Sequence, residues 1–334
     1  MNPSTENKIV LVTRATRLHD LVRRFNTVEQ ARFYVEHLGA DFSDYLAEDD
    51  NYGRARRQAE ETLANQGRIQ VVDRVYLPNF MFGPKDTVVV LGQDGLVANT
   101  LKYLDGQPVL GVNPDEARWD GQLLPFKVGD LPKVLPEVLR GGRSRRSVTM
   151  ATANLNNGQS LLAVNDLFIG PRSHGSARYR IAIGDEAERQ SSSGVIVSTG
   201  LGSTGWFTSL MTGAAAIADI AGSLLGDTSV PNRAKPHEIS QRTDHLGSEH
   251  GAIATFPWEA RYLYFTVREP FPSNTTRASL VFGRVTPEAP LVLVSEMAEQ
   301  GVIFSDGIEK DFLDFNAGAR AVISLAERKG CLVT

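Results

Sequence analysis

Apolar and polar positions follow two different patterns along the chain, and the pattern changes at the Gly- and Arg-rich stretch Arg140–Arg146. Before it, short apolar runs alternate with segments of helical periodicity, which predicts an α/β domain with an open, mostly parallel sheet. The run Thr87–Leu91 is apolar almost throughout, as expected of a parallel strand covered on both faces. Strands are predicted at Lys8–Thr13, Val71–Leu77, Thr87–Leu91 and Pro108–Val112, and helices at Thr27–Leu38 (with Asn26 as its cap), Tyr52–Asn65, Leu96–Leu104 and Leu131–Leu139.

After this stretch, strand-like runs separated by turns dominate, which predicts a β-rich, sandwich-like second domain. Only Ser209–Leu225 has the pattern of a long helix, and residues 227–250 are polar and predict a long loop. The expected strands are Ser147–Ala153, Ser160–Phe168, Arg178–Ile183, Val195–Ser198, Tyr262–Arg268, Ala278–Val285, Leu291–Val294 and Gly301–Ser305. The chain therefore divides into an α/β domain over residues 1–142 and a β-rich domain over 143–315.

Composition excludes several classes of protein. The chain has 334 residues, 42% hydrophobic and 22% charged, which is ordinary usage for two globular domains. Its net charge of -4 argues against a nucleic-acid coat, and its single cysteine, Cys331, allows no internal disulfide and fits a reducing cytoplasm. Phe207–Gly226 carries Asp219 and several hydroxyl residues, so a buried helix is expected there and no membrane partner.

Three loops carry candidate chemistry, and the first is Gly92-Gln93-Asp94-Gly95. It follows the buried strand Thr87–Leu91 and precedes a helix. Glycines at such a turn let backbone N–H groups approach a phosphate, which a helix N-terminus also favours. An aspartate beside phosphate needs a metal or a proton-transfer role, although Gly-X-Asp-Gly is more often a plain turn.

The other two loops lie in the second half. Asn165-Asp166 ends an apolar run, and its carboxylate and amide suit a ribose diol and a base, or simply end a strand. In Val195–Trp206 a strand leads through a Gly/Ser/Thr loop into a helix, which is again a cradle for phosphate or ribose, unless Ser203 or Thr204 merely caps the helix. Together the three loops suggest a nucleotide held in an interdomain cleft.

The order and context of these loops resemble the NAD kinase family, which has a Gly-Gly-Asp-Gly loop after a parallel strand, an Asn-Glu pair and a Thr-Pro-Thr-Gly-Ser-Thr-Ala-Tyr stretch. The likeness spans about Val88 to Asp306. The mitochondrial-type branch is the most similar, on the motifs Pro108–Asp115, Asn165–Gly170, Arg268–Pro270 and Phe304–Gly307.

The resemblance implies a role for each matching residue. Asp94 would be the catalytic carboxylate, acting on the 2'-hydroxyl of the adenosine ribose of NAD, and ATP with Mg²⁺ would be the phosphate donor. Residues implied in binding phosphate or ATP are Gly92, Gln93 and Gly95, and those implied in binding NAD are Asn165, Asp166, Thr199, Gly202, Ser203, Thr204 and Trp206. The family also implies a homodimer or higher homo-oligomer, and a C-terminal segment, residues 316–334, that returns to the first domain.

The chain departs from the family's pattern at several of these positions. Gln93 replaces the second glycine, so a positive φ there would strain the loop. Asp166 replaces a glutamate, and Trp206 replaces a tyrosine. Two alternatives therefore stay open, a kinase of another polyol and a non-catalytic dinucleotide-binding protein.

Two other features have plain interpretations. The arginines of Arg140–Arg146 suit a solvated linker, or otherwise a site for ATP phosphates. His237, His245 and His250 share one loop at irregular spacing, which is a weak pattern for zinc.

Overall fold

The structure is a computed structural model and describes residues 8–224 and 255–334. The chain forms two compact units. Unit 1 is Met1–Met150 with Glu327–Thr334, and unit 2 is Ala151–Ala326. The predicted loop over residues 227–250, with its three histidines, lies outside the described residues.

Unit 1 is built on the predicted parallel sheet. Its strands are β1 (Lys8–Thr13), β2 (Arg68–Asp73), β3 (Thr87–Leu91) and β4 (Pro108–Asn113), with the short β5 (Phe126–Lys127) beside β4. They lie in the order β4-β3-β1-β2, and each neighbouring pair is parallel. The end of β17 (Arg320–Val333) adds a further parallel strand beside β4, with Cys331 opposite Pro108.

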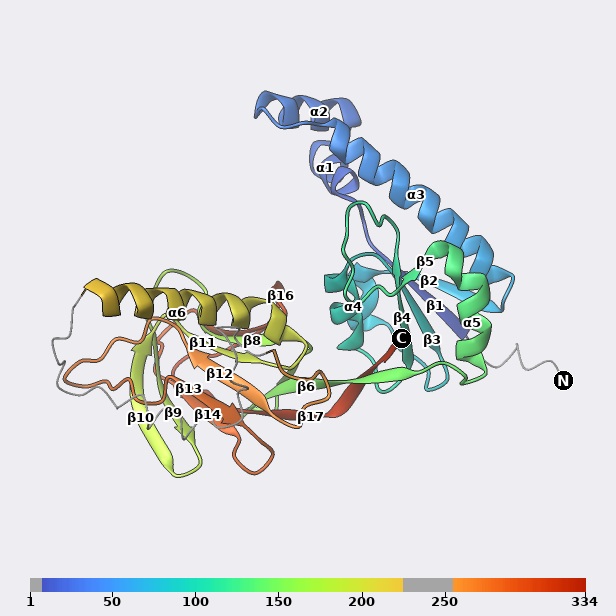
Figure 1. Cartoon of the computed structure of the whole chain (residues 1–334). Coiled ribbons are helices and arrows are strands. Elements are labelled where there is room, and N and C mark those ends of the chain that lie inside the picture. The colour runs from blue at the N-terminus through green and yellow to red at the C-terminus, as the bar shows by residue number, and fades with distance from the viewer. Residues whose placement is uncertain (1–7, 225–254) are drawn as a thin grey trace. The chain divides into compact units, whose positions relative to one another are not determined.

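Helices cover both faces of this sheet. Helices α3 (Ser43–Ala64) and α5 (Leu131–Leu139) cover one face, and α4 (Asp94–Leu101) lies on the other (Figure 1). Alternate residues of β1 and β3 point toward α3 and α5, so that Ile9 and Leu11 join a core with Ala59 and Leu63. The sheet is therefore buried on both faces, which explains the uninterrupted apolar runs in the sequence.

The segment between β1 and β2 is more helical than predicted. Helix α1 (Arg17–Phe25) is not among the predicted elements. Helix α3 begins at Ser43, inside the acidic stretch Asp41–Asp50, whose composition suggests a solvated loop. The helix includes this stretch because its acids meet arginines from elsewhere in unit 1, which no local pattern shows. Helix α2 (Val28–His37) is capped by Thr27, whose hydroxyl accepts from the Gln30 N–H at 3.1 Å, and not by Asn26.

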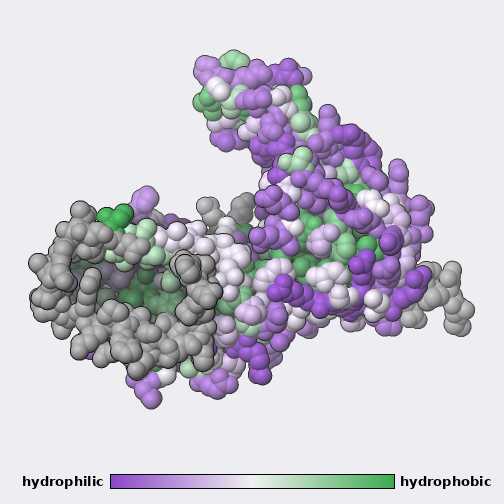
Figure 2. Space-filling model, viewed as in Figure 1, coloured by the Kyte–Doolittle hydropathy of each residue, from purple (hydrophilic) through white to green (hydrophobic). Residues whose placement is uncertain are grey.

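Helices α1 and α2 have a small core of their own, formed by Leu18, Ala31, Val35 and Phe42. Apolar side chains also remain on the outer surface of α2, where Phe33 is 70% exposed, whereas the visible surface of α3 is largely hydrophilic (Figure 2). The predicted strand Val71–Leu77 is wrong in its second half, because β2 ends at Asp73 and a 3₁₀ helix, Arg74–Asn79, follows. The Asp73 carboxylate caps this helix by accepting from the Val75 N–H at 3.0 Å.

Unit 2 contains two sheets that face each other across one apolar core, which confirms the predicted sandwich-like, β-rich half. One of them, which we call sheet B, is antiparallel and has the strand order β13-β12-β11-β8-β15-β16. The facing sheet includes β10-β9-β14-β17, and β6 and β7 pair at its edge. The bounds are β6 Arg145–Leu155, β7 Ser160–Ala163, β8 Asp166–Pro171, β9 Ala177–Ile183, β10 Glu186–Ser192, β11 Val195–Ser198, β12 Leu263–Val267, β13 Phe282–Val285, β14 Leu291–Ser295, β15 Gly301–Ser305 and β16 Ile308–Asp314.

Helix α6 (Trp206–Leu224) lies over the outer face of sheet B (Figure 1). The ring of Phe207 stacks on Tyr264 and lies tilted against Phe282, with ring centroids 6.0 and 6.2 Å away. These contacts hold the start of the helix on the sheet. Within residues 8–224 and 255–334, no helix has the length and apolar character needed to cross a membrane.

Candidate functional site

The carboxyl edge of the parallel sheet in unit 1 is the natural place for a ligand in this architecture. The chain leaves β1 toward β2 on one side and returns to β3 on the other side of β1, so the strand order reverses between β1 and β3. Open α/β sheets bind ligands at such a switch point, beyond the carboxyl ends of the strands. The loop Gly92–Gly95 follows β3 at this edge, as the sequence predicts.

The loop Gly92–Gly95 is a tight turn into helix α4. The Gly92 N–H donates to the carbonyl of Val112 on β4 at 3.2 Å, and the Leu96 N–H donates to the carbonyl of Gln93 at 2.8 Å. Asp94 begins the helix, and its Oδ1 accepts from the Leu123 N–H at 2.7 Å. The carboxylate is thus held by the chain that follows β4.

Residue 111 shows how closely that chain approaches the sheet. A Cβ at Gly111 would lie 1.8 Å from the carbonyl oxygen of Leu123, so only glycine allows this packing. Leu123 then sits where its N–H reaches Asp94. The direction of the Asp94 carboxylate is therefore set by two elements, the helix that carries it and the loop packed on β4.

Gln93 carries no backbone strain. Its φ is -113° and its ψ is 166°, an extended conformation that any residue adopts, and it precedes α4 as the N-cap without a side-chain hydrogen bond. The backbone strain that a positive φ at Gln93 would cause, at the position of the family's second glycine, is therefore absent. The Gln93 side chain is half-buried at the turn.

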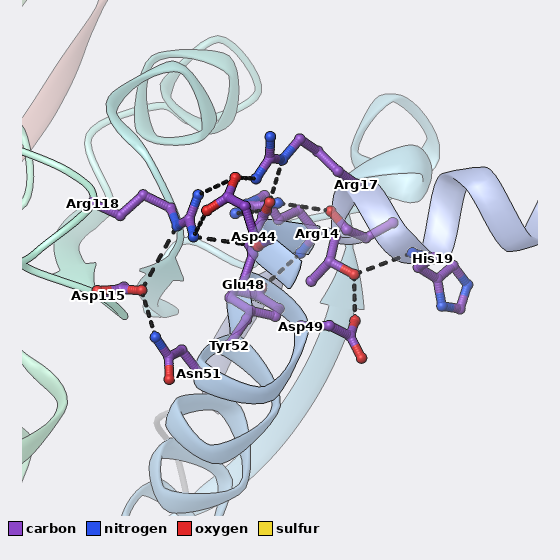
Figure 3. A network of polar contacts seen from close by, with 12 residues as sticks. Arg14, Arg17, His19, Asp44, Glu48, Asp49, Asn51, Tyr52, Asp115 and Arg118 are labelled. Carbon is purple, nitrogen blue, oxygen red and sulfur yellow. Dashed lines mark hydrogen bonds and ion pairs between the residues drawn. The ribbon is translucent and has the colours of Figure 1, made fainter. Parts of the chain in front are cut away.

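A network of arginines and carboxylates lies at the same edge of the sheet (Figure 3). Arg14, the residue after β1, is almost fully buried, and its Nη2 pairs with Glu48 of α3 at 2.9 Å. The Arg14 N–H donates to the Tyr52 hydroxyl at 2.9 Å, and this hydroxyl donates to the carbonyl of Leu91 at 3.0 Å. The network therefore reaches the last residue of β3, next to Gly92.

Each guanidinium of the network is paired with a carboxylate. Arg17 pairs with both Glu48 and Asp44, and Arg118 pairs with Asp44 at 2.6 Å. Burial alone would raise the pKa of Glu48, but hydrogen bonds from Arg17 and Arg14 outweigh it and lower that pKa. Hydrogen bonds from Arg118 and then Arg17 lower the pKa of Asp44. Since each guanidinium has a carboxylate, the network braces α3 against the sheet edge rather than offering free cations.

The arginines of the stretch 140–146 have local roles in unit 1. Arg143 pairs with Glu137 of α5 at 2.8 Å, and Arg145 and Arg146 begin β6. This placement fits the linker interpretation better than a phosphate site.

In unit 2, the residues Asn165 and Asp166 lie at a break between two strands. A single strand is predicted over Ser160–Phe168, but β7 ends at Ala163 and β8 begins at Asp166. The turn Val164–Asp166 separates them, and Asp306 accepts from its backbone N–H groups. We refer to this three-residue segment as the 164–166 turn. The Asn165 side-chain amide is half-buried and has no hydrogen bond to the residues that the structure describes.

The third motif packs directly on the 164–166 turn. The Thr199 hydroxyl donates to the Val164 carbonyl at 2.5 Å, and the Thr199 N–H donates to the Asn165 carbonyl at 2.9 Å. A Cβ at Gly202 would lie 2.0 Å from the Asn165 carbonyl oxygen, so glycine is required for this approach. Residues that the sequence separates by more than 30 positions are therefore in direct contact.

The hydroxyls of this motif serve its own backbone. Ser203 is fully buried and donates to the Gly200 carbonyl at 2.7 Å, and the Phe256 N–H donates to its hydroxyl. Thr204 is exposed, and Trp206 is 38% exposed. The Trp206 ring stacks on Phe168 of β8 at 5.8 Å, and the Arg268 guanidinium lies 5.6 Å from its centroid. Trp206 is therefore a partly exposed aromatic side chain that already contacts Phe168 and Arg268.

Asp166 is the acid of this turn, and its pKa is strongly raised. It is 9% exposed, and burial together with the charge of Asp306 raises its pKa to about 7. The carboxyl group is therefore divided between its neutral and charged forms near neutral pH. In the neutral form it can donate a hydrogen bond as well as accept one.

The sequence did not predict two groups of polar residues that lie near these loops. The residues of the Arg14 network form no sequence motif, because they come from three separate segments of the chain. Asp306 lies in Phe304–Gly307, which the sequence marks only as part of the family likeness.

The fold of the chain is that of the NAD kinases. An NAD kinase from Archaeoglobus fulgidus, solved in complex with ATP, matches with a TM-score of 0.52 and 15% identity, over 98% of this chain and 93% of that one. Yeast NADH kinase, solved with NADH, matches with a TM-score of 0.54 and 17% identity, over 98% and 83%.

Among curated proteins, the chain is similar to NAD kinase 2, mitochondrial, of Homo sapiens. The two are 24% identical over 328 residues, which cover 82% of this chain and 73% of the human protein. No protein-family model matches. The resemblance to NAD kinases, with a mitochondrial NAD kinase among the relatives, is thus confirmed.

Proposed function

We propose that this protein is an ATP-dependent NAD kinase that phosphorylates the 2'-hydroxyl of the adenosine ribose of NAD and forms NADP. One observation carries the proposal: within a fold of the NAD kinase type, the two predicted NAD-binding motifs of unit 2 pack on each other at the 164–166 turn. The solved neighbours hold ATP in one case and NADH in the other, which supports nucleotide substrates.

Unit 2 binds the dinucleotide in this proposal. Asn165 and Asp166 contact it directly, since an amide and a carboxyl group together match the donors and acceptors of a ribose and a base. Trp206 and Thr204 are both exposed enough to contact the ligand. Thr199, Gly202 and Ser203 act indirectly, because their contacts hold the 164–166 turn and the loop beside it.

Unit 1 supplies the chemistry. The Asp94 carboxylate takes the proton of the 2'-hydroxyl while the 2'-oxygen bonds to the γ-phosphorus of ATP. The bond between this phosphorus and the oxygen that bridges to the β-phosphate breaks, and ADP leaves. Asp94 suits this role because Leu123 fixes its direction through one oxygen. The backbone N–H groups of Gln93 and Gly95 are proposed to approach the phosphates at the turn into α4. Gly92, whose N–H donates to the Val112 carbonyl, is proposed to shape that turn.

The donor set in unit 1 fits a magnesium ion that arrives with ATP. Mg²⁺ is usually bound through one or two carboxylates together with substrate phosphates and water. Among the described residues, no group of three or more acidic, His or Cys side chains could hold a metal ion. We propose that the Asp94 carboxylate would meet an ion that ATP brings. The ion would neutralise charge on the transferred phosphoryl group. The homo-oligomer and the cytoplasmic location stay predictions.

Formation of NADP⁺ from NAD⁺, ATP and Mg²⁺ by the purified protein tests the proposal, with NADH, polyphosphate and a sugar panel in parallel. We expect NADP⁺ with ATP as donor. A sugar phosphate without NADP⁺ would assign the protein to another polyol. NAD binding without any turnover would assign it to the non-catalytic alternative.

A further inference from the structure

We infer that Asp306 is a positioning residue for dinucleotide binding: its carboxylate clamps the 164–166 turn and thereby aims Asn165 and Asp166. The inference rests on the proposed function, because it assigns the residue that prepares the proposed NAD site.

The carboxylate of Asp306 accepts from three consecutive backbone N–H groups. Asn165 donates to Oδ1 at 2.7 Å, and Asp166 donates to the same atom at 3.3 Å. Val164 donates to both oxygens, at 3.0 and 3.1 Å. Bonds from backbone N–H groups to an ionised carboxylate are roughly twice as strong as neutral ones, so one side chain fixes three peptide groups.

The carbonyl groups of the same three residues are also engaged. Those of Val164 and Asn165 accept from the Thr199 hydroxyl and N–H, and that of Asp166 accepts from the Asp306 N–H at 2.9 Å. Every backbone donor and acceptor of the turn thus has a partner within unit 2. The backbone of this turn is therefore held entirely by protein groups, as expected for a buried segment.

A simpler explanation of Asp306 is its place in a hairpin. Asp306 and Gly307 form the two-residue turn between β15 and β16, with φ of 54° and 68°. Such turns favour Asp-Gly and Asn-Gly whatever the side chain contacts. The explanations differ in what they require: the hairpin needs a residue that tolerates positive φ, whereas the clamp needs a carboxylate.

Two substitutions separate these requirements. Asp306→Gly tolerates positive φ and removes the carboxylate. Asp306→Asn also suits the turn and keeps one accepting oxygen, but its amide NH₂ group replaces the second oxygen and cannot accept from the backbone N–H groups. The matched control is Asp185→Gly, in the exposed β9–β10 hairpin beside Gly184, whose φ is 56°.

Steady-state kinetics and hydrogen exchange of the full-length protein test the inference. We expect Asp306→Gly to raise the KM for NAD about 10-fold to 100-fold while the KM for ATP stays nearly unchanged, with Asp306→Asn intermediate and Asp185→Gly at the wild-type value. Exchange at the amides of Val164, Asn165 and Asp166 should accelerate in Asp306→Gly.

An unchanged KM for NAD in Asp306→Gly, with an active wild type, would overturn the inference and leave the proposed function intact. Equal increases in both KM values would do the same, because they would indicate a general loss of structure. If the wild type forms no NADP⁺, the proposed function is wrong, and the claim that Asp306 serves NAD binding is wrong as well. The exchange rates then decide the clamp alone, and unchanged rates would overturn it.

Discussion

Two of the three predicted site loops differ in how their backbones are held. The 164–166 turn has hydrogen-bond partners for all of its backbone groups, from Asp306 on one side and Thr199 on the other. The loop Gly92–Gly95 is anchored mainly at its ends, by bonds to Val112 and Leu96, and by the single bond from Leu123 to Asp94.

This difference matches the two tasks that we propose. Recognition of a dinucleotide gains from groups that are already in place, because less conformational entropy is lost on binding. A phosphate cradle instead needs N–H groups that are still free to bind the ligand. Changes in unit 2 should therefore alter NAD affinity, and changes in the unit 1 loop should alter the chemical step.

The largest effect is expected from Asp94→Asn, which keeps the shape of the side chain and removes its charge. Loss of a positioned base lowers kcat by about 10²–10⁴-fold, and the fold should survive because Asn can still accept from Leu123. Turnover with saturating NAD and ATP measures it. Asp105→Asn, in an exposed turn after α4, is the control. A kcat within a few-fold of wild type would make Asp94 a turn residue only.

The next largest effect is expected from Gly202→Ala in unit 2. The added Cβ would lie 2.0 Å from the Asn165 carbonyl oxygen, so the 164–166 turn must move. A displacement of about 1 Å can cost about 100-fold, and we expect this loss in the NAD affinity measured by calorimetry. Gly213→Ala, in α6 with open space around it, should bind NAD normally. Equal affinities of the two variants would contradict the packing account.

Asp166→Asn should change how stability depends on pH. The raised pKa of about 7 means that folded Asp166 keeps a proton that the unfolded chain loses near pH 4, so its contribution to stability falls as pH rises between these values. Asn removes this loss. The variant should be more stable than wild type at pH 8, on the order of 2–4 kcal/mol, with the gain vanishing toward pH 4.

Thermal or denaturant unfolding of Asp166→Asn from pH 4 to 8 measures this, with the exposed Asp185→Asn as control. A difference in unfolding free energy between variant and wild type that does not vary with pH would contradict the raised pKa of Asp166 in the folded protein.

The smallest effect is expected from Gln93→Gly, which restores the family's glycine. Because Gln93 has an ordinary extended backbone, no strain is relieved, and the added chain entropy costs about 0.5–1 kcal/mol of stability. We expect kcat/KM for both substrates to stay within about threefold of wild type. A marked gain would indicate that the side chain crowds the phosphates, and a marked loss would indicate that its amide binds them.

The sequence predicts the fold well where local patterns dominate. The strands Lys8–Thr13, Thr87–Leu91 and Val195–Ser198 and the helix Leu131–Leu139 have the predicted bounds, because burial on a sheet or a helix face leaves a clear period. The early start of α3 could not be predicted, since it depends on ion pairs with Arg17 and Arg118.

The candidate site divides in the same way. Gly92–Gly95 and Asn165-Asp166 stand out because turn residues follow apolar runs. The proposed role of Asp306 could not be predicted from the sequence, because its partners lie about 140 residues away. The Asp-Gly pair also has a local explanation as a hairpin turn.

The division of tasks between the two loops is tested most directly by the kinetics of Asn165→Ala. Loss of one hydrogen bond costs about 0.5–1.5 kcal/mol, so the KM for NAD should rise roughly twofold to tenfold. The KM for ATP and kcat should stay at their wild-type values, because the turn that carries Asn165 keeps all its backbone bonds. A rise in the KM for ATP with an unchanged KM for NAD would contradict the account.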